Sequence, residues 1–358
     1  MNTTNLIQKV DFTDKNIFVG MDVHLNSWNI SIFLDRTFVR SFTQPPSINA
    51  LEHLLRRDYP GATYLCGYES GFCGFWIQRE LQQRGIPCQV LHAADIPQTA
   101  KQKLVKRDPV DSKKIGDALS SDKVNSIYIP DEESERDRSL VRYRDRIQKD
   151  LTRSKNRIRS ILYQFGIELP EKYHKGWSNR FIEWLRDSDQ VQGSARTTLN
   201  YMVEQMILHR SMLLKVNRDI RALQNSEKYK QRMLWLVSIP GIGPLTAIIL
   251  LVELIDMRRF SSFRQLNSFV GLYPMEHSSG EDEHKGAITI RHNKHLRKIL
   301  VEDSWTAIRH DPALTLAFSQ LTLRMTSKRA IVKIARKLLS RVRYVLMNET
   351  FYENGVVK

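Results

Sequence analysis

Two long helical patterns occupy the middle of this chain and limit how the rest of it can fold. The first, EESERDRSLVRYRDRIQKDLTRSKNRIRSILYQFG, begins at residue 132, and the second, SARTTLNYMVEQMILHRSMLLKVNRDIRALQNSEKYKQR, ends at residue 232. Both repeat apolar residues at intervals of three and four, the period of one buried helix face. We therefore expect a helical hairpin or coiled-coil arm, which divides the 358 residues into domains 1–128, 129–230 and 231–358.

The residues before and after the arm have different patterns. NIFVGMDV, WNISIFL and TYLCGYESG are strand-like, whereas SINALEHLLRRDY has a serine cap followed by helical spacing. This order predicts a mixed sheet with helices on its faces. The residues after the arm are mostly helical and include an amphipathic basic helix, IVKIARKLLSRVRYVLMNETF. The predicted fold class is therefore α/β plus α.

The charge of the chain favours polyanionic partners. Its 55 Lys and Arg against 39 Asp and Glu give a net charge of +16, and basic side chains that neutralise phosphates release counterions. The alternative is a soluble protein that happens to be basic. Three cysteines without zinc-like spacing indicate reduced thiols. The polar start and the interrupted apolar run LWLVSIPGIGPLTAIILLVEL predict a cytoplasmic protein without a membrane segment.

Four carboxylates stand where a sheet and a helix could bring them together. Asp22 follows the apolar run IFVGM, and Glu69 ends the strand-like run TYLCGYE. Asp108 and Asp111 lie about one helical turn apart at an expected helix start. Oxygen ligands suit Mg²⁺, and a pair of such ions can activate an attacking oxygen and stabilise a leaving one. The alternative for each acid is an ordinary salt bridge.

Two features point to nucleic-acid phosphates. Residues 136–159 carry ten Arg or Lys against three Asp, a net charge of +7, and arginine suits bidentate phosphate contacts. The run SIPGIGP resembles a helix–hairpin–helix, in which glycines let backbone N–H groups approach a phosphate. A solvated helix face and a tight structural turn are the alternatives. The candidate residues are Arg142, Arg146, Arg153, Arg157, Gly241 and Gly243.

A pair of serines lies in the stretch MEHSSGEDEH. Ser278 and Ser279 precede Gly280, and serines beside glycine are usually turn formers. The stretch does not match the G-x-S-x-G elbow, and no Asp/His arrangement nearby offers a hydrolase triad. Spacing alone therefore favours a turn. His292 and His295, which follow, fit a solvated helix face better than a metal site.

Together these motifs resemble the insertion-sequence one-hundred-and-ten transposases, also called DEDD recombinases, a family that includes the Piv-type DNA invertases. The resemblance rests on FVGMDVH, GYESG, KRDPVDSKKIGDAL, SIPGIGP and SFVGLYPMEHSSG, followed by GAIT and HLRKIL, in that order. It spans nearly the whole chain, and the combination is far more specific than any single motif.

The resemblance implies an RNase H or RuvC-like N-terminal domain that binds Mg²⁺, or Mn²⁺, through the four acids. It implies an arm that mediates subunit contact in a dimer or tetramer. The C-terminal transposase domain would supply a serine that becomes joined to DNA, which by its place before the glycine is Ser279, with Ser278 as the alternative. Family members also use a structured noncoding bridge RNA that pairs with donor and target double-stranded DNA. The implied function is a site-specific, RNA-guided transposase.

The chain departs from the family pattern after the serines. Ile290 stands where lysine is common and His292 where glycine is common, and Arg291 could replace the missing charge. Arg291, Lys294 and Arg297 are further candidates for nucleic-acid contact. Two competing functions stay open: a nuclease of the Holliday-junction-resolvase type that uses only the four acids, and a non-catalytic nucleic-acid-binding protein.

Overall fold

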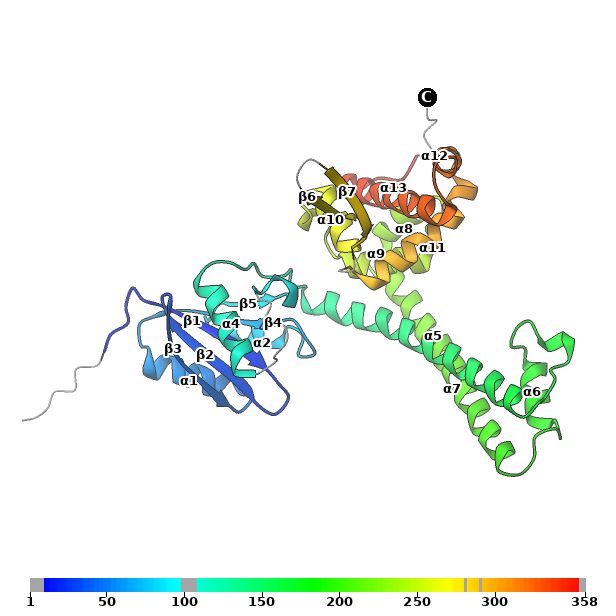
Figure 1. Cartoon of the computed structure of the whole chain (residues 1–358), viewed down its shortest axis with the longest axis horizontal. Helices are drawn as coiled ribbons and strands as arrows, with labels where there is room; N and C mark the ends of the chain where they lie inside the picture. Colours follow the sequence, from blue (N-terminus) through cyan, green and yellow to red (C-terminus); the bar gives the residue numbers. More distant parts are fainter. Residues whose placement is uncertain (1–9, 98–107, 280–281, 290–291, 354–358) are drawn as a thin grey trace, which may run out of the picture. The chain divides into compact units, whose positions relative to one another are not determined.

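The structure, a computed structural model, describes residues 10–97, 108–279, 282–289 and 292–353, without the side chains of residues 108–110, 274–279 and 282–287. The chain divides into two compact units, Met1–Ile129 and Pro130–Lys358 (Figure 1). Within the described ranges, no helix is long and apolar enough to cross a membrane.

The first unit is built on a five-stranded mixed sheet, as the sequence predicts. β1 (Asn16–Val23), β2 (Trp28–Leu34) and β3 (Thr37–Gln44) pair antiparallel. β4 (Thr63–Glu69) and β5 (Cys88–Leu91) extend the sheet from β1 in parallel, which gives the order β3-β2-β1-β4-β5. Parallel neighbours need crossover connections, and α1 (Ile48–Asp58) and α2 (Trp76–Gln83) lie in those connections. A short 3₁₀ turn, η1 (Ala93–Asp95), follows β5.

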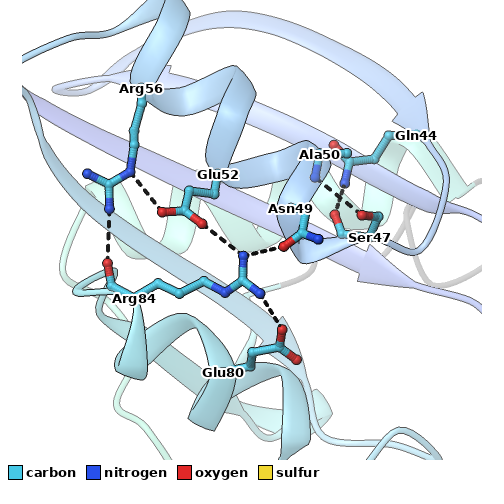
Figure 2. A network of polar contacts seen from close by, with 8 residues as sticks. All are labelled: Gln44, Ser47, Asn49, Ala50, Glu52, Arg56, Glu80 and Arg84. Atoms are coloured by element: carbon cyan, nitrogen blue, oxygen red, sulfur yellow. Dashed lines mark hydrogen bonds and ion pairs between the residues drawn. The ribbon is translucent and has the colours of Figure 1, made fainter.

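Helices α1 and α2 share a core with one face of this sheet and are tied to each other by a polar network (Figure 2). Ser47 caps α1 as predicted, since its hydroxyl accepts from the Ala50 amide at 3.2 Å. The Arg84 guanidinium donates to Glu52 at 2.8 Å and to Glu80 at 2.6 Å. Arg84 therefore joins the end of α2 to α1 and fixes the two helices side by side.

The opposite face of the sheet carries α4 (Asp108–Ser120), packed at very short range. A Cβ added to Gly20 of β1 would lie 2.1 Å from the Ser112 carbonyl oxygen and 2.3 Å from the Gly116 amide nitrogen. A Cβ added to Gly116 would lie 2.6 Å from the Phe33 ring. The buried hydroxyls of Ser31 and Ser112 lie 2.8 Å apart and share a hydrogen bond. The absence of side chains at both glycines allows this contact.

Replacing Gly20 with alanine is therefore expected to destabilise the first unit. The new methyl group would meet backbone atoms that cannot rotate away, and overpacking of this kind costs about 1–3 kcal/mol or more. Urea unfolding of the whole protein would measure the change. Gly71→Ala is the control, because the nearest atom to its added Cβ is 3.9 Å away. Equal stability of the two variants would show that α4 is not held as closely as described.

The second unit contains the two long helices predicted by the sequence. α5 (Glu132–Gln164) begins after Asp131, whose side chain accepts from the Ser134 amide at 2.8 Å. η2 (Glu171–Tyr173), α6 (Asn179–Asp187) and α7 (Gly193–Gln224) follow, and α7 returns along α5 (Figure 1). The second predicted pattern is too long, because α7 ends before residue 232. The chain turns there to bury Tyr229, whose hydroxyl donates to Asp137 at 2.7 Å.

The rest of the second unit is a helical bundle with one β-hairpin. Apolar residues from all six of the helices in residues 230–348 form a common core. Gly241 joins α8 to α9 with φ +94°, and a Cβ there would lie 2.7 Å from the Ala307 Cβ of α11. The elements are α8 (Lys230–Val237), α9 (Pro244–Leu254), η3 (Met257–Arg259), α10 (Phe263–Val270), β6 (Pro274–Ser279), β7 (Asp282–Ile288), α11 (Lys294–His310), α12 (Pro312–Thr322) and α13 (Ser327–Asn348).

Candidate active site and nucleic-acid interface

Asp22 and Glu69 occupy matching positions at the C-terminal ends of two neighbouring parallel strands. The residues just before them pair with each other across β1 and β4. Side chains alternate between the two faces of a sheet, and the glycines two positions earlier, Gly20 and Gly67, both face α4. Asp22 and Glu69 therefore stand on the face that α4 covers, one strand apart.

The start of α4 lies at the level of Asp22. Gly116 of α4 packs against Phe33 of β2, and Ser112, one helical turn earlier, bonds to Ser31, two residues earlier in β2. One helical turn and two strand residues each advance about 6 Å, so the two elements keep the same register. One further turn leads to Asp108, and two further residues of β2 lead to Asn29, which pairs with Asp22. The register of α4 thus directs its first residue toward the end of β1 that carries Asp22.

The acids whose side chains are described have different surroundings. The Asp22 Oδ2 lies 3.1 Å from the His24 Nε2, and the Asp22 side chain is 20% exposed. Glu69 is exposed. The Asp111 Oδ1 lies 2.7 Å from the Lys114 Nζ, so this carboxylate has a cation partner within α4. A metal ion bound by Asp111 would compete with this lysine or use the other carboxylate oxygen.

The donor set at this edge suits a hard divalent cation, although the described side chains do not yet form a complete site. Among them, which exclude that of Asp108, no group of three or more His, Cys, Asp or Glu could hold a metal ion. Two carboxylates on one sheet face, beside a helix that begins with a third, are nevertheless the oxygen ligands that Mg²⁺ takes. The residue types and the backbone positions fit such an ion.

The serine pair lies in a β-hairpin and not in the turn that spacing alone predicts. Ser278 and Ser279 end β6, where they pair with Glu283 and Asp282 of β7. Gly280 lies outside the described residues, as do Ile290 and Arg291. The two serines therefore have defined backbone positions at the tip of the strand pair.

A buried carboxylate connects α5 to the helix that follows this hairpin. Glu253 in α9 is 1% exposed and accepts two hydrogen bonds from Arg142 of α5, at 2.6 and 2.7 Å. It also accepts from the Asn293 amide group at 2.7 Å, and the Asn293 Oδ1 caps α11 by accepting from two backbone amides. Burial alone would raise the pKa of Glu253, but Arg142 and Asn293 outweigh it and hold that pKa below the usual glutamate value.

Comparison with known proteins identifies the family. Residues 19–167 match the model of the DEDD transposases of IS110 elements, and residues 234–319 match that of the transposase IS116/IS110/IS902 family. The first range contains the four acids, and the second contains both serines. The chain belongs to the IS110 family of transposases. It is therefore an enzyme that acts on DNA.

Several relatives align with this transposase over most of its length. The Coxiella burnetii transposase for insertion sequence element IS1111A is 25% identical over 289 residues, which cover 80% of this chain and 78% of that protein. The Leptospira borgpetersenii transposase for IS1533 is 25% identical over 261 residues, with 71% and 74% covered. The Sinorhizobium fredii protein y4rJ is 27% identical over 296 residues, with 76% and 74% covered.

The basic residues predicted on α5 differ in how the transposase uses them. Arg142 is held by Glu253, so its guanidinium is engaged within the protein. Arg153 forms an ion pair with Asp150 at 3.0 Å. Arg146 and Arg157 are exposed and lie outside every ion pair among the described residues. These two remain the better candidates on α5.

The other residues predicted to contact nucleic acid also differ in whether the protein itself uses them. Gly241 is required by its backbone conformation and its contact with α11, whereas a Cβ on Gly243 would meet open space. Lys294 is exposed, but Arg297 donates to the Thr289 carbonyl oxygen. His295 is half-buried with its Nδ1 3.6 Å from the Asp145 Oδ2, so the solvated face predicted for it is wrong.

Sequence reasoning missed the role of Glu253 and Asn293 in this transposase. A signal was present, because Glu253 lies in an otherwise apolar run, and a buried acid needs hydrogen-bond or charge partners. Its partner Arg142 lies 111 residues away along the chain. Residues so far apart along the chain form no local sequence pattern, so the pair could not be predicted from the sequence.

Proposed function

We propose that this transposase is a site-specific recombinase of its insertion sequence, which cleaves and exchanges DNA strands through a covalent serine–DNA intermediate. Residues 1–128 would form a RuvC-like catalytic domain and residues 129–230 an arm for subunit contact. Residues 231–358 would form the domain that carries the nucleophile. Mg²⁺, or Mn²⁺, would be held by Asp22, Glu69, Asp108 and Asp111. Ser279 would be the nucleophile, with Ser278 as the alternative.

The observation that carries this proposal is the juxtaposition of Asp22 and Glu69. They stand at adjacent strand ends on the face covered by α4, and the register of α4 leads its first residue, Asp108, to the same level. Carboxylates brought together at such neighbouring positions repel unless a cation or a proton is bound. A divalent cation bound there would supply positive charge to the phosphate oxygens and favour loss of a hydroxyl proton.

The chemistry assigned to Ser279 conserves the phosphodiester bonds. Its hydroxyl oxygen attacks a DNA phosphorus, a phosphoserine ester forms, and the bond from phosphorus to the strand-end oxygen breaks. The serine gives up its proton, and the displaced oxygen takes one up. The hydroxyl of another strand end then attacks the phosphoserine, rejoins the DNA and returns Ser279 to its starting state. This covalent step suits recombination better than hydrolysis does.

A guide RNA would supply the sequence specificity. The net charge of +16 suits a large polyanion, and base pairing by a noncoding bridge RNA would select the donor and target DNA. Purification of the protein expressed with its native flanking DNA, followed by sequencing of any bound nucleic acid, tests this. We expect one discrete RNA from the noncoding end of the element. Only heterogeneous nucleic acid, removed by salt, would contradict guidance by RNA.

Asp22→Asn is expected to lower DNA strand cleavage by more than about 100-fold. The amide keeps the shape of the side chain but removes the charge that holds the cation, and even changes to outer-shell partners of a metal cost about 10–100-fold. RNA binding should be unchanged. The measurement is cleavage of a labelled DNA that carries the element's end, with Mg²⁺ varied.

Asp117→Asn provides the matched control, because Asp117 is an exposed acid on the same helix α4. It should cleave as the unaltered protein does. Cleavage by Asp22→Asn at the rate of the unaltered protein would remove the acid cluster from the mechanism, whereas absence of cleavage by the unaltered protein itself would favour a protein that only binds nucleic acid.

A further inference from the structure

The far end of the arm has a small core of its own. The second half of α5, the segment with η2 and α6, and the first half of α7 bury a common set of apolar side chains there (Figure 1). Phe181 is fully buried and lies between the rings of Tyr173, Trp177 and Trp184. This part of the arm is therefore an ordered platform that can position charged groups.

Two cations, Lys155 and Arg159, lie beside the Trp177 ring at this platform, and a third, Arg210, is near enough to Lys155 to act on its charge. We name Lys155, Arg159 and Arg210 the arm-end cluster. The Lys155 Nζ lies 5.8 Å and the Arg159 Cζ 5.6 Å from the centroid of the Trp177 ring. Arg159 also donates to the His174 carbonyl oxygen at 3.2 Å. Arg210, from α7, donates to the Asn179 Oδ1 at 3.0 Å.

The charges of the arm-end cluster are not neutralised within the protein. Its contacts are with an aromatic ring, a carbonyl oxygen and a side-chain amide, and none of the three cations has an ion pair within the described part of the chain. Burial, together with the charges of Arg210 and Arg159, lowers the pKa of Lys155. Like charges held this close repel one another, and a bound anion would relieve that repulsion.

A groove beside the cluster is large enough for one nucleotide base. It has a volume of about 360 Å³ and runs between α6 and α7, within the size range of small-ligand sites. Asn179 and Arg210 belong both to its lining and to the contacts of the cluster. Ile182 and Ile207 give it apolar walls, and Glu183 supplies an acceptor for base N–H groups.

We propose that the arm end binds single-stranded RNA, with a backbone phosphate at the arm-end cluster and an unpaired base in the groove. Arginine and lysine donors suit phosphate oxygens, and specific RNA recognition uses unpaired bases placed against apolar, aromatic or guanidinium surfaces. The inference rests on the proposed RNA-guided function and adds a contact site on the arm. Duplex DNA keeps its bases paired and cannot fill the groove.

The test compares a triple variant, Lys155→Gln/Arg159→Gln/Arg210→Gln, with a control, Arg57→Gln/Arg136→Gln/Arg258→Gln. The control removes the same charge, but its three arginines are exposed and paired with Asp58, Glu132 and Glu349. Fluorescence anisotropy over a range of NaCl concentrations would follow binding of a single-stranded RNA of about 16 nucleotides, within the span of such sites, and of a DNA duplex of the same length.

We expect the triple variant to bind the RNA about 10-fold more weakly or worse, with a salt slope smaller by about 0.7, since each phosphate neutralised contributes about 0.7 on single strands. The control should lose less, and duplex binding should change equally in both variants. Lys155→Gln alone should reduce RNA binding without affecting the fold, since Lys155 makes no hydrogen bond among the described residues.

Equal RNA affinity and slope for the two triple variants would overturn the arm-end site. A loss of duplex DNA affinity in the arm-end variant that is as large as its loss of RNA affinity, and larger than in the control, would reassign the cluster to duplex backbone and overturn the RNA site. Failure of the unaltered protein to bind RNA at all would contradict the proposed function itself, which separates the two conclusions.

Discussion

Ser279→Ala is expected to abolish strand exchange and to eliminate any covalent protein–DNA product, while RNA binding is retained. The alanine lacks the hydroxyl that would attack the phosphorus and form the ester. The measurement is the loss of a DNA-linked protein band on a denaturing gel after reaction with labelled DNA. The same samples, assayed for bound RNA, report whether the protein still assembles.

Ser278→Ala is the matched control, because Ser278 is the neighbour of Ser279 in β6. It should retain the adduct, and the reverse result for the two variants would assign the nucleophile to Ser278. Cleavage without an adduct in every variant would favour a resolvase-like nuclease that uses only the acids. Loss of both exchange and RNA binding in Ser279→Ala would indicate a structural role for that position.

Glu253→Ala is expected to destabilise the second unit by about 3–5 kcal/mol, because removal of one partner of a buried ion pair leaves the other uncompensated. It also leaves the Asn293 amide without its acceptor. Arg142 retains 39% exposure of its side chain, so the lower end of this range is expected. Urea unfolding of the whole protein, followed by circular dichroism, would measure the change.

The double variant Arg142→Met/Glu253→Met separates the charge pair from the packing. It replaces both ions with apolar groups of similar length, a change that is often neutral, so it should be more stable than Glu253→Ala. The depressed pKa of Glu253 also predicts a pH dependence of stability. The contribution of the ionised Glu253 to the free energy of unfolding is complete above its pKa in the unfolded chain and is lost as the pH falls through its pKa in the folded protein. A Glu253→Ala variant as stable as the unaltered protein at pH 7 would contradict this account.

Local patterns predicted much of the first unit. The alternation in WNISIFL gives β2, and Ser47 caps α1 where the sequence places the cap. The strand ends at Asp22 and Glu69 follow from where apolar runs turn polar. The approach of α4 to the sheet could not be predicted, because it depends on Gly20 and Gly116 meeting across a distance of many residues. Local spacing contains no information about that contact.

Long-range pairing explains the main differences in the second unit. MEHSSGEDEH reads as a turn because glycine follows two serines, yet pairing with β7 makes both serines strand residues. The helical pattern through residue 232 is interrupted after Gln224, where the chain turns and buries Tyr229 in the core of the second unit. Lys155 and Arg210 lie on different helices, so the arm-end cluster exists only after the arm folds back on itself.

The carboxylate of Glu253 also links the arm mechanically to the segment that follows the β6–β7 hairpin. A rotation of α5 about its own axis would displace Arg142, and through Glu253 the displacement would reach Asn293 at the start of α11. Two short side chains with fixed hydrogen bonds transmit force far better than a loop would. A torque applied to the arm would therefore reach the segment beside the hairpin through these hydrogen bonds.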